Sequence, residues 1–179
     1  MQLKDYIPWV DKKHSKVFFF FIAFDSSKVR KDDIFFAIKG NKSDGNNYIN
    51  SAIQRGAKII ISEKKKFKNI KNITFITSKN VRKLLANTSF KILNKKPKNL
   101  IAVTGTNGKS SVADFYYQIL ELNSKKVASI GTIGVRCKDY KKNLENTTLD
   151  PIRLSYLLKD LNKKKIEYVI MEASSHGLK

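Results

Sequence analysis

The sequence has one cysteine and no long apolar run. A single cysteine, Cys137, excludes an internal disulfide and a metal site built from several cysteines, and it is typical of a chain in a reducing cytoplasm. The longest apolar run, VFFFFIAF at residues 17–24, is too short to cross a bilayer, since a helical span needs about 20 residues. The first residues, MQLKDYIPWV, lack the organisation of a secretion signal. We therefore expect a cytoplasmic chain without membrane insertion, and we interpret residues 17–24 as a buried strand.

Arginine is also scarce, although the formal net charge is +21. Only five of the 36 basic residues are arginine, and the lysines are scattered in short runs such as 64–66 and 163–165. Arginine is the preferred bidentate reader of bases and phosphates, so its scarcity argues against sequence-specific nucleic-acid binding. A lysine-rich solvated surface is the favoured interpretation, and we expect no specific nucleic-acid partner. A non-catalytic basic module that binds nucleotides or nucleic acid remains the alternative.

The hydrophobic fraction of 41% is enough to build a core, and the pattern predicts an α/β chain in two parts. The polar segment NKKPKN at residues 94–99 separates two halves, which we assign as domains 1–95 and 96–179. In the first half, apolar runs predict strands at 33–38, 57–62 and 73–77. A short helix at 48–57, ending near Gly56, and a longer helix at 80–94, capped by Asn80, complete a small α/β domain.

The second half alternates strands and helices more regularly. Strands are predicted at 99–103, 126–130 and 166–171. The first helix follows a glycine-containing turn, and its predicted buried face consists of Val112, Phe115, Tyr116, Ile119 and Leu120. The second helix starts with Asp150 as N-cap and Pro151 in the first turn. Such alternation predicts a parallel sheet covered by helices, with ligands beyond the carboxyl ends of the strands.

The strongest local motif is IAVTGTNGKSS, which joins the first strand of this half to its helix. Gly105 and Gly108 would let the backbone approach phosphate oxygens, Lys109 would reach the outer phosphates, and the Ser110 hydroxyl would bind magnesium. A strict GxxxxGK[ST] match fails, because Val103 stands where the first glycine belongs. The GxxGKS core remains in a strand–loop–helix context. We therefore favour a phosphate loop over a glycine turn that happens to precede a lysine.

Four spaced segments resemble one family. TGTNGKSS resembles the phosphate loop of the Mur ligases and their folylpolyglutamate synthetase relatives. NTTLDP and MEASSHGL are similar to the TTPDP and MEVSSHGL elements of the MurE type, and residues 24–49 are similar to the N-terminal segment of that type. The resemblance implies a small N-terminal α/β UDP-binding domain followed by a truncated parallel-sheet P-loop ATPase domain.

The resemblance also implies an activity, which is ATP-dependent amide-bond formation in peptidoglycan precursor synthesis. An amino acid, diaminopimelate or lysine, would be joined to UDP-N-acetylmuramoyl-L-alanyl-D-glutamate through an acyl phosphate. A Mur-type ligase that adds the terminal dipeptide is the alternative, although its strand-end motif usually lacks SSHGL. The implied cofactors are ATP and Mg²⁺, and we expect a monomer.

Site residues carry over position by position. The implied ATP-binding residues are Gly105, Thr106, Asn107, Gly108, Lys109 and Ser110. Ser110 and Glu172 would hold magnesium, and the catalytic set would be Lys109, Glu172 and His176. His176 would shape the metal and phosphate surroundings, with a purely structural role as the alternative. A nucleophile triad is excluded, because SSHG lacks the GxSxG elbow.

The implied substrate-binding residues are Asp25, Ser26, Thr147, Thr148 and Ser174. Asp25 and Ser26 would cradle the uridine end, whereas the other three would contact the sugar-peptide. Ordinary capping and turn chemistry is the alternative for the two threonines. Ser27 replaces an arginine that is usual in the family, and Leu149 replaces the first proline of TTPDP.

The family architecture has three parts, and this chain resembles the first and a portion of the second. The lysine that is carbamylated in the family and the domain that selects the amino acid lie downstream of the resemblance. We therefore expect no ligase turnover from this chain alone. We also expect poor solubility, because a sheet that stops after Met171 would expose an unfinished strand edge.

Overall fold

Each half of the chain builds its own β-sheet in this computed structural model, which describes residues 1–40, 43–64, 70–138, 140–144 and 149–173. The chain divides into two units, Met1–Ile92 and Leu93–Lys179. Both units combine sheets with helices, and the predicted α/β class is confirmed. Within the described ranges, no helix combines the length and the apolar character that a membrane crossing requires.

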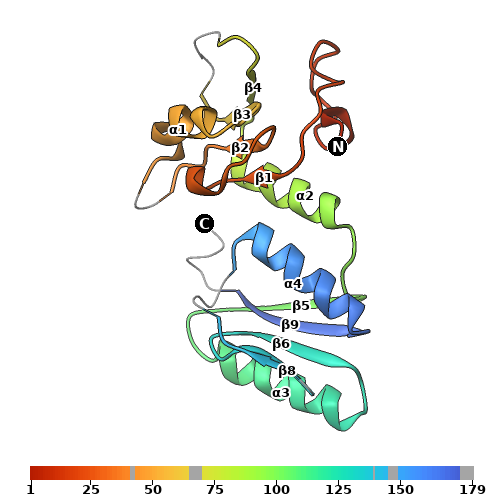
Figure 1. Cartoon of the computed structure of the whole chain (residues 1–179). Coiled ribbons are helices and arrows are strands. Elements are labelled where there is room, and N and C mark those ends of the chain that lie inside the picture. Colours follow the sequence, from red (N-terminus) through yellow and green to blue (C-terminus); the bar gives the residue numbers. More distant parts are fainter. Residues whose placement is uncertain (41–42, 65–69, 139, 145–148, 174–179) are drawn as a thin grey trace. The chain divides into compact units, whose positions relative to one another are not determined.

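The sheet of the first unit is entirely parallel. Its strands are β1 (Ile22–Ala23), β2 (Ile34–Phe36), β3 (Ile59–Ser62) and β4 (Thr74–Thr77), and they pair in sequence order. The helices α1 (Ile49–Gln54) and α2 (Val81–Leu93) lie on opposite sides of it (Figure 1). Short 3₁₀ turns occupy Leu3–Asp5, Ser26–Lys28 and Gly45–Tyr48. All residues of β2 and β3 are buried, as expected when both faces of a parallel sheet are covered.

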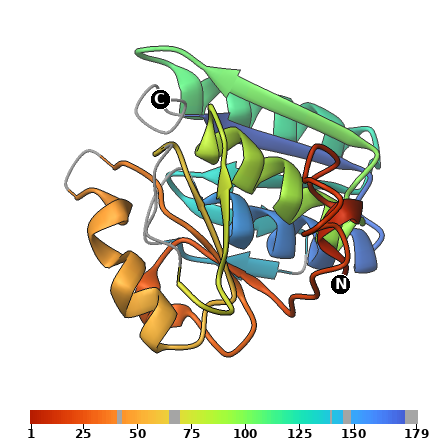
Figure 2. The ribbon, with the colours of Figure 1, turned by 90° about the horizontal axis from the view of Figure 1, so that it is seen from above.

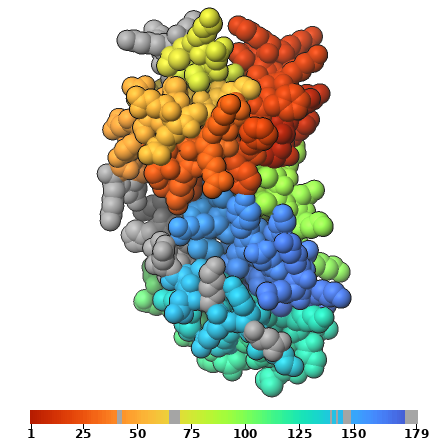
Figure 3. Space-filling model, in the orientation of Figure 1, coloured from red at the N-terminus to blue at the C-terminus, as the bar shows by residue number. Residues whose placement is uncertain are grey.

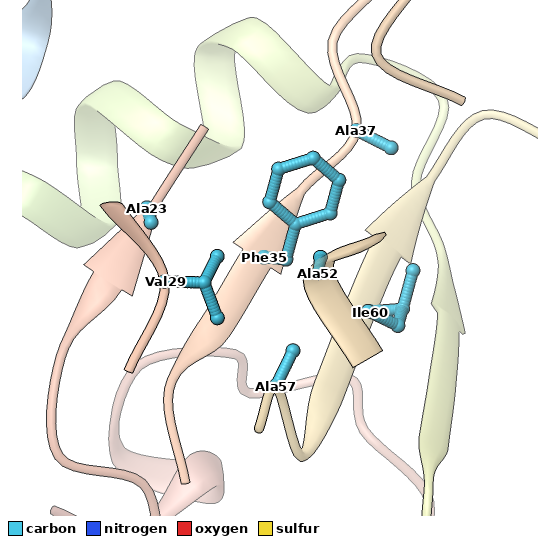
Figure 4. Packing of buried hydrophobic residues seen from close by; sticks show 7 residues of the cluster. All are labelled: Ala23, Val29, Phe35, Ala37, Ala52, Ala57 and Ile60. Carbon is cyan, nitrogen blue, oxygen red and sulfur yellow. The ribbon is translucent and has the colours of Figure 1, made fainter. Parts of the chain in front are cut away.

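The core on the α1 side forms around Phe35 and Ile60, which are fully buried on neighbouring strands. Figure 4 shows these two side chains among the small residues that surround them, which are Ala23, Val29, Ala37, Ala52 and Ala57. The predicted end of α1 is confirmed at Gly56, whose φ of 105° is a conformation that suits glycine. A Cβ at this position would also lie 2.8 Å from the Lys31 Cα, so the turn needs glycine for space as well.

The prediction of a buried strand over residues 17–24 is wrong for most of its length. Only Ile22–Ala23 form β1, and Phe18 and Phe20 are 56% and 70% exposed. Residues 17–19 instead pair with the N-terminal segment, where the Leu3 N–H donates to the Val17 oxygen at 2.9 Å. Of the four consecutive phenylalanines, the alternating pleat buries Phe19, whose ring lies 5.4 Å from that of Tyr6. This part of the apolar run therefore has one buried face and one exposed face.

The described residues of the second unit form five strands in the order β5, β9, β6, β7, β8. The predicted strands are present as β5 (Asn99–Thr104), β6 (Val127–Gly131) and β9 (Tyr168–Ala173), and they are parallel. Sequence analysis missed the antiparallel hairpin of β7 (Gly134–Cys137) and β8 (Tyr140–Lys142). Figure 2 shows the long ribbons of β5 and β9 side by side.

The helices α3 (Lys109–Leu122) and α4 (Pro151–Lys163) cover opposite faces of this sheet (Figure 1). The chain passes from β5 to β6 and then returns to β9 between them, and right-handed crossovers in opposite directions place their helices on opposite faces. The last described strand, β9, is an inner strand and is not itself an edge, so any unfinished edge of this sheet lies at another strand. In the described part of the chain the outer strands are β5 and β8.

The predicted buried face of α3 is also wrong. Ala113 and Tyr117 are buried against the sheet and Leu120 is partly buried beside them. Val112, Phe115, Tyr116 and Ile119, which we call the outer face of α3, are 50%, 63%, 44% and 58% exposed. Helical periodicity identified an apolar stripe, but this helix carries two, and the sheet packs against the one with the smaller Ala113 and the amphipathic Tyr117. The surface of this unit, with α4 in blue and α3 in green to teal, is visible in Figure 3.

The double substitution Phe115→Lys/Ile119→Lys should raise the solubility of the chain and leave its unfolding temperature nearly unchanged, because both side chains lie on the outer face. Tyr117→Ala is the contrasting variant, since that side chain is 2% exposed. Removing it should lower the free energy of unfolding by about 3 kcal/mol. Saturation concentrations and urea unfolding curves measure the two effects. Equal destabilisation by both variants would show that the outer face is packed.

Candidate nucleotide and metal site

The loop between β5 and α3 has the backbone that a phosphate loop requires. Gly105 has a φ of 151° and Gly108 a φ of 75°, and residues with side chains adopt such values at a cost. A Cβ at Gly108 would meet nothing within 4 Å, so conformation rather than space demands glycine there. Residues 104–108 are exposed, which leaves their backbone amides open to a ligand.

The loop leads directly into the N-terminus of α3. Gly108 is the N-cap residue and has no side chain with which to cap the helix, and its carbonyl accepts the first helical hydrogen bond, from the Val112 N–H at 2.9 Å. The first N–H groups of a helix lack partners within it, and the aligned peptide dipoles make this end positive. With the glycine loop in front of it, this end of α3 suits the oxygens of a phosphate group.

Lys109 brings a positive charge to the same place. Its ammonium donates hydrogen bonds to the carbonyl oxygens of Gly105 at 2.7 Å and of Thr106 at 3.2 Å. The side chain is therefore folded back across the loop, with the charge beside the exposed amides. An ammonium so placed can exchange a carbonyl partner for a phosphate oxygen without crossing the site.

Glu172 lies at the carboxyl end of β9, opposite Val103 of β5 in the parallel register. The residue is 6% exposed, and both of its carboxylate oxygens accept hydrogen bonds. The Ser110 hydroxyl donates to Oε2 at 2.8 Å, the Thr132 hydroxyl donates to Oε2 at 3.1 Å, and the Thr132 N–H donates to Oε1 at 3.2 Å. The structure thus brings together Ser110 and Glu172, which the sequence analysis assigned to a metal.

These two residues fit a magnesium ion. Mg²⁺ binds oxygen ligands at about 2.1 Å with octahedral geometry, so adjacent ligand atoms are separated by about 3 Å. The 2.8 Å between the Ser110 hydroxyl and Oε2 of Glu172 is close to that separation. Among the residues that the structure describes, no group of three or more histidine, cysteine, aspartate or glutamate side chains is placed to hold a metal. A site with two protein oxygens suits Mg²⁺, which usually keeps waters and binds phosphates.

Sequence analysis missed Gly131 and Thr132. Gly131 ends β6 beside Glu172, and a Cβ added to it would overlap the glutamate side chain, 2.7 Å from its Cγ. Thr132 follows at once and donates to both oxygens of the carboxylate, from its N–H and from its hydroxyl. The available signal was a small polar pair directly after an apolar strand, at the edge where ligands of parallel sheets lie.

In the first unit, Asp25 caps the 3₁₀ turn Ser26–Lys28. Its Oδ1 accepts hydrogen bonds from the Ser27 hydroxyl at 2.7 Å and the Ser27 N–H at 2.9 Å. The hydroxyl bond is the largest influence that holds the pKa of Asp25 below its ordinary value, and Lys28, whose ammonium lies 3.8 Å from Oδ2, lowers the pKa further. Ser26 is half-buried in the same turn. The serine that replaces an arginine therefore serves to fix Asp25.

The remaining predicted site residues, Thr147, Thr148, Ser174 and His176, lie outside the described residues. The helix that follows the two threonines is confirmed. Asp150 accepts a hydrogen bond from the Arg153 N–H at 2.9 Å, and Pro151 occupies the first turn of α4. Leu149 in place of proline has not prevented this helix from starting where the sequence predicts.

A glycine loop, its lysine and a strand-end glutamate on an α/β sheet define a P-loop domain. Comparison with known proteins then identifies the family. Sequence models described as "Mur ligase family, catalytic domain" and "Mur ligase middle domain" match residues 19–102 and 103–179, and the chain belongs to the Mur ligase family.

Several relatives are named UDP-N-acetylmuramoyl-L-alanyl-D-glutamate–2,6-diaminopimelate ligase. The protein of Rickettsia conorii is 44% identical over 161 residues, covering 88% of this chain and 33% of that protein. The protein of Wigglesworthia glossinidia brevipalpis is 37% identical over 187 residues, covering 99% of this chain and 38% of that protein. The chain thus spans between a third and two fifths of the length of these relatives.

Solved structures give the same picture of the fold. A structure of a UDP-N-acetylmuramoyl-L-alanyl-D-glutamate–2,6-diaminopimelate ligase superposes with a TM-score of 0.80 and 27% identity, over 99% of this chain and 37% of that chain. The MurF ligase of Thermotoga maritima, solved in complex with ADP, has a TM-score of 0.52 and 24% identity over 86% of this chain and 32% of its own. The latter likeness concerns the fold alone.

Ser27→Ala should raise the pKa of Asp25 toward its ordinary value of 3.8, because the variant removes the hydroxyl that stabilises the carboxylate most. A carboxyl whose pKa is lowered by folding contributes stability that is fully present above its unfolded pKa and is lost as the pH falls through its folded pKa. The variant should therefore lose less stability on acidification below about pH 4. Carboxyl ¹³C NMR titration measures the pKa, and Ser26→Ala is the matched control. An unchanged pKa in Ser27→Ala would contradict the assigned cause.

Proposed function

We propose that this chain is the UDP-sugar- and ATP-binding portion of a peptidoglycan precursor ligase. The ligase would join an amino acid to UDP-N-acetylmuramoyl-L-alanyl-D-glutamate in the cytoplasm, at the expense of ATP. Family membership and the names of the relatives support this assignment. The observation that carries it is the 2.8 Å hydrogen bond from Ser110 to Glu172, which joins the end of the phosphate loop to the strand-end carboxylate.

On this proposal the loop residues Gly105 to Ser110 bind ATP, and Ser110 and Glu172 hold magnesium. Bound there, Mg²⁺ would neutralise negative charge on the phosphates, which is much of what phosphoryl transfer requires. The loop amides and the N-terminus of α3 orient the phosphates, and the ammonium of Lys109 adds a second positive charge. The buried position of Glu172 keeps its carboxylate facing this site.

The substrate side is proposed by residue match. Asp25 and Ser26 would contact the uridine end, and Thr147, Thr148 and Ser174 would contact the sugar-peptide. His176 would lie near the metal and phosphates. Binding of the UDP-sugar would position the glutamate γ-carboxylate for phosphorylation to an acyl phosphate, which the incoming amine then attacks. The assignment of residues 1–95 to the UDP-sugar and of 96–179 to ATP is part of the same proposal.

The relatives are named for diaminopimelate, and diaminopimelate or lysine is the proposed amino acid. A ligase that adds the terminal dipeptide is less well supported, because MEASSHGL resembles the MurE element. A basic nucleic-acid-binding module would rest on the net charge of +21 alone. Binding to nucleic acid that disappears with modest salt would reflect that charge and nothing more specific.

The chain should bind a fluorescent ATP analogue more tightly in Mg²⁺ than in EDTA. Lys109→Ala should weaken this binding by about tenfold or more, since an ammonium–phosphate hydrogen bond contributes about 1.5–3 kcal/mol. The matched control is Lys125→Ala, which removes an exposed lysine near the opposite end of α3. Equal loss in both variants would indicate that general charge, and not the loop, attracts the nucleotide.

Incubated with ATP, the UDP-sugar dipeptide and diaminopimelate or lysine, the chain alone should release no ADP that depends on the amino acid. The reason is that these 179 residues match only 33% to 38% of the relatives' length, and the resemblance does not reach the part of the family that selects the amino acid. A coupled ADP assay provides the measurement, with a full-length relative as positive control. Amino-acid-dependent ADP release from the chain would contradict the expectation.

A further inference from the structure

We propose that Thr132, with Gly131, is a positioning residue that holds the Glu172 carboxylate beside the Ser110 hydroxyl at the spacing of two magnesium ligands. This inference rests on the proposed function above, because it concerns the same metal. The observations that carry it are the two hydrogen bonds from Thr132 to opposite oxygens of one buried carboxylate.

The two bonds from Thr132 fix the plane of the carboxylate. Its N–H donates to Oε1 and its hydroxyl to Oε2, so rotation about the last torsion of Glu172 would break both. Ser110 donates to the same Oε2 as the Thr132 hydroxyl. The oxygen at ligand spacing from Ser110 is therefore the one that the Thr132 side chain holds.

Thr132 is itself held by the hairpin in which it lies. Gly131 pairs with Gly134 in the antiparallel register of β6 and β7, so Thr132 is the first of two turn residues closed by that pair. On its other side β6 pairs with β9, with Ile130 opposite Met171, the residue before Glu172. The donor directly follows β6 and the acceptor lies in β9, the neighbouring strand of the same sheet, which makes their geometry reproducible.

Gly131 provides the space for this arrangement. Its backbone lies so close to Glu172 that a Cβ would overlap the carboxylate and would lie 2.7 Å from the Cγ. Any side chain at this position would push the glutamate away from Thr132 and Ser110. Gly131 therefore allows the Glu172 side chain to approach the backbone of β6, and Thr132 orients its carboxylate.

Holding the carboxylate in advance should strengthen metal binding. A glutamate that is free to rotate loses rotamer entropy when it is fixed, which corresponds to roughly tenfold in affinity. In this chain folding has already fixed Glu172. Loss of the Thr132 hydroxyl should return part of that freedom while the backbone N–H still binds Oε1, so the expected effect is smaller than tenfold.

The test compares Thr132→Val with Thr132→Ser in the full 179-residue chain. The quantity measured is the ratio of the dissociation constants of a fluorescent ATP analogue in EDTA and in Mg²⁺. Valine keeps the shape and removes the hydroxyl, and should reduce the ratio about three- to tenfold with the constant in EDTA unchanged. Serine keeps the hydroxyl and should restore the ratio to within about twofold. A ratio in Thr132→Val equal to that of the wild type would overturn the proposal.

Two further measurements separate this inference from folding and from the proposed function. Thermal unfolding of each variant shows whether a loss is merely structural. In the ligand-free chain, ¹³C relaxation should find the Glu172 side chain rigid in the wild type and in Thr132→Ser, and mobile in Thr132→Val. Equal rigidity in all three overturns the positioning role even if no nucleotide binds. A third outcome is that Glu172 becomes mobile only in Thr132→Val, while nucleotide binding by the wild type is the same in Mg²⁺ and in EDTA. That outcome retains the positioning role and overturns the proposed function.

Discussion

The candidate site depends on one hydrogen bond, from Ser110 to Glu172, between residues that are 62 positions apart in the chain. It joins the first turn of α3 to the end of β9, and it exists because β9 pairs with β5 in parallel register. The phosphate loop leaves β5 at the same edge of the sheet where β9 ends. Pairing therefore places the carboxylate beside the loop, and the buried position of Glu172 keeps it there. The Thr132 contacts then complete an arrangement that the sheet has already determined.

The surface charge attracts anions without selecting among them, unlike the candidate site. Several of the ion pairs in the structure join exposed side chains, such as Lys163 with Asp160 at 3.6 Å, and pairs of this kind contribute little to stability. The net charge of +21 attracts anions over a distance limited by screening, about 8 Å at physiological salt. Such attraction does not distinguish a nucleotide from another polyanion. On the proposed function, selectivity for a triphosphate would come from short-range contacts with the loop amides and Lys109, and from the metal that Glu172 would hold.

Most of the fold could be predicted from the sequence. Of the candidate site, Ser110 and Glu172 could be predicted and Thr132 could not. Apolar runs with clear boundaries became β2, β3, β5, β6 and β9, and local capping residues such as Asp150 started their helices correctly. Errors arose where a long-range partner decides the outcome. The run at 17–24 was apolar enough for a buried strand, but it pairs with the N-terminal segment at an edge. The outer face of α3 looked like a core stripe, because periodicity does not say which of two stripes meets the sheet.

The site shows the same division. The motif GKS is a local signal and the resemblance of MEASSHGL pointed to Glu172, so the sequence named both members of the pair that the structure brings together. Thr132 was missed because its role follows from strand order, with β6 next to β9, and no local pattern encodes that order. The hairpin of β7 and β8 was missed for a related reason. Both strands are short. β7 (GVRC) begins with a glycine and has no apolar run, and β8 (YKK) is mostly lysine, a residue common at sheet edges.

The position of β9 has a consequence for how the second unit forms. This strand is the last of the five along the chain, yet it lies between β5 and β6. Because β9 separates β5 from β6, these two strands do not pair with each other. During synthesis, their edges on that side stay unpaired until Tyr168–Ala173 has been made and inserts between them. Contacts over such sequence separations form slowly. Glu172 is part of the same strand, so on the proposed function Ser110 and Glu172 would come together only after β9 has inserted, and nucleotide binding would report that insertion.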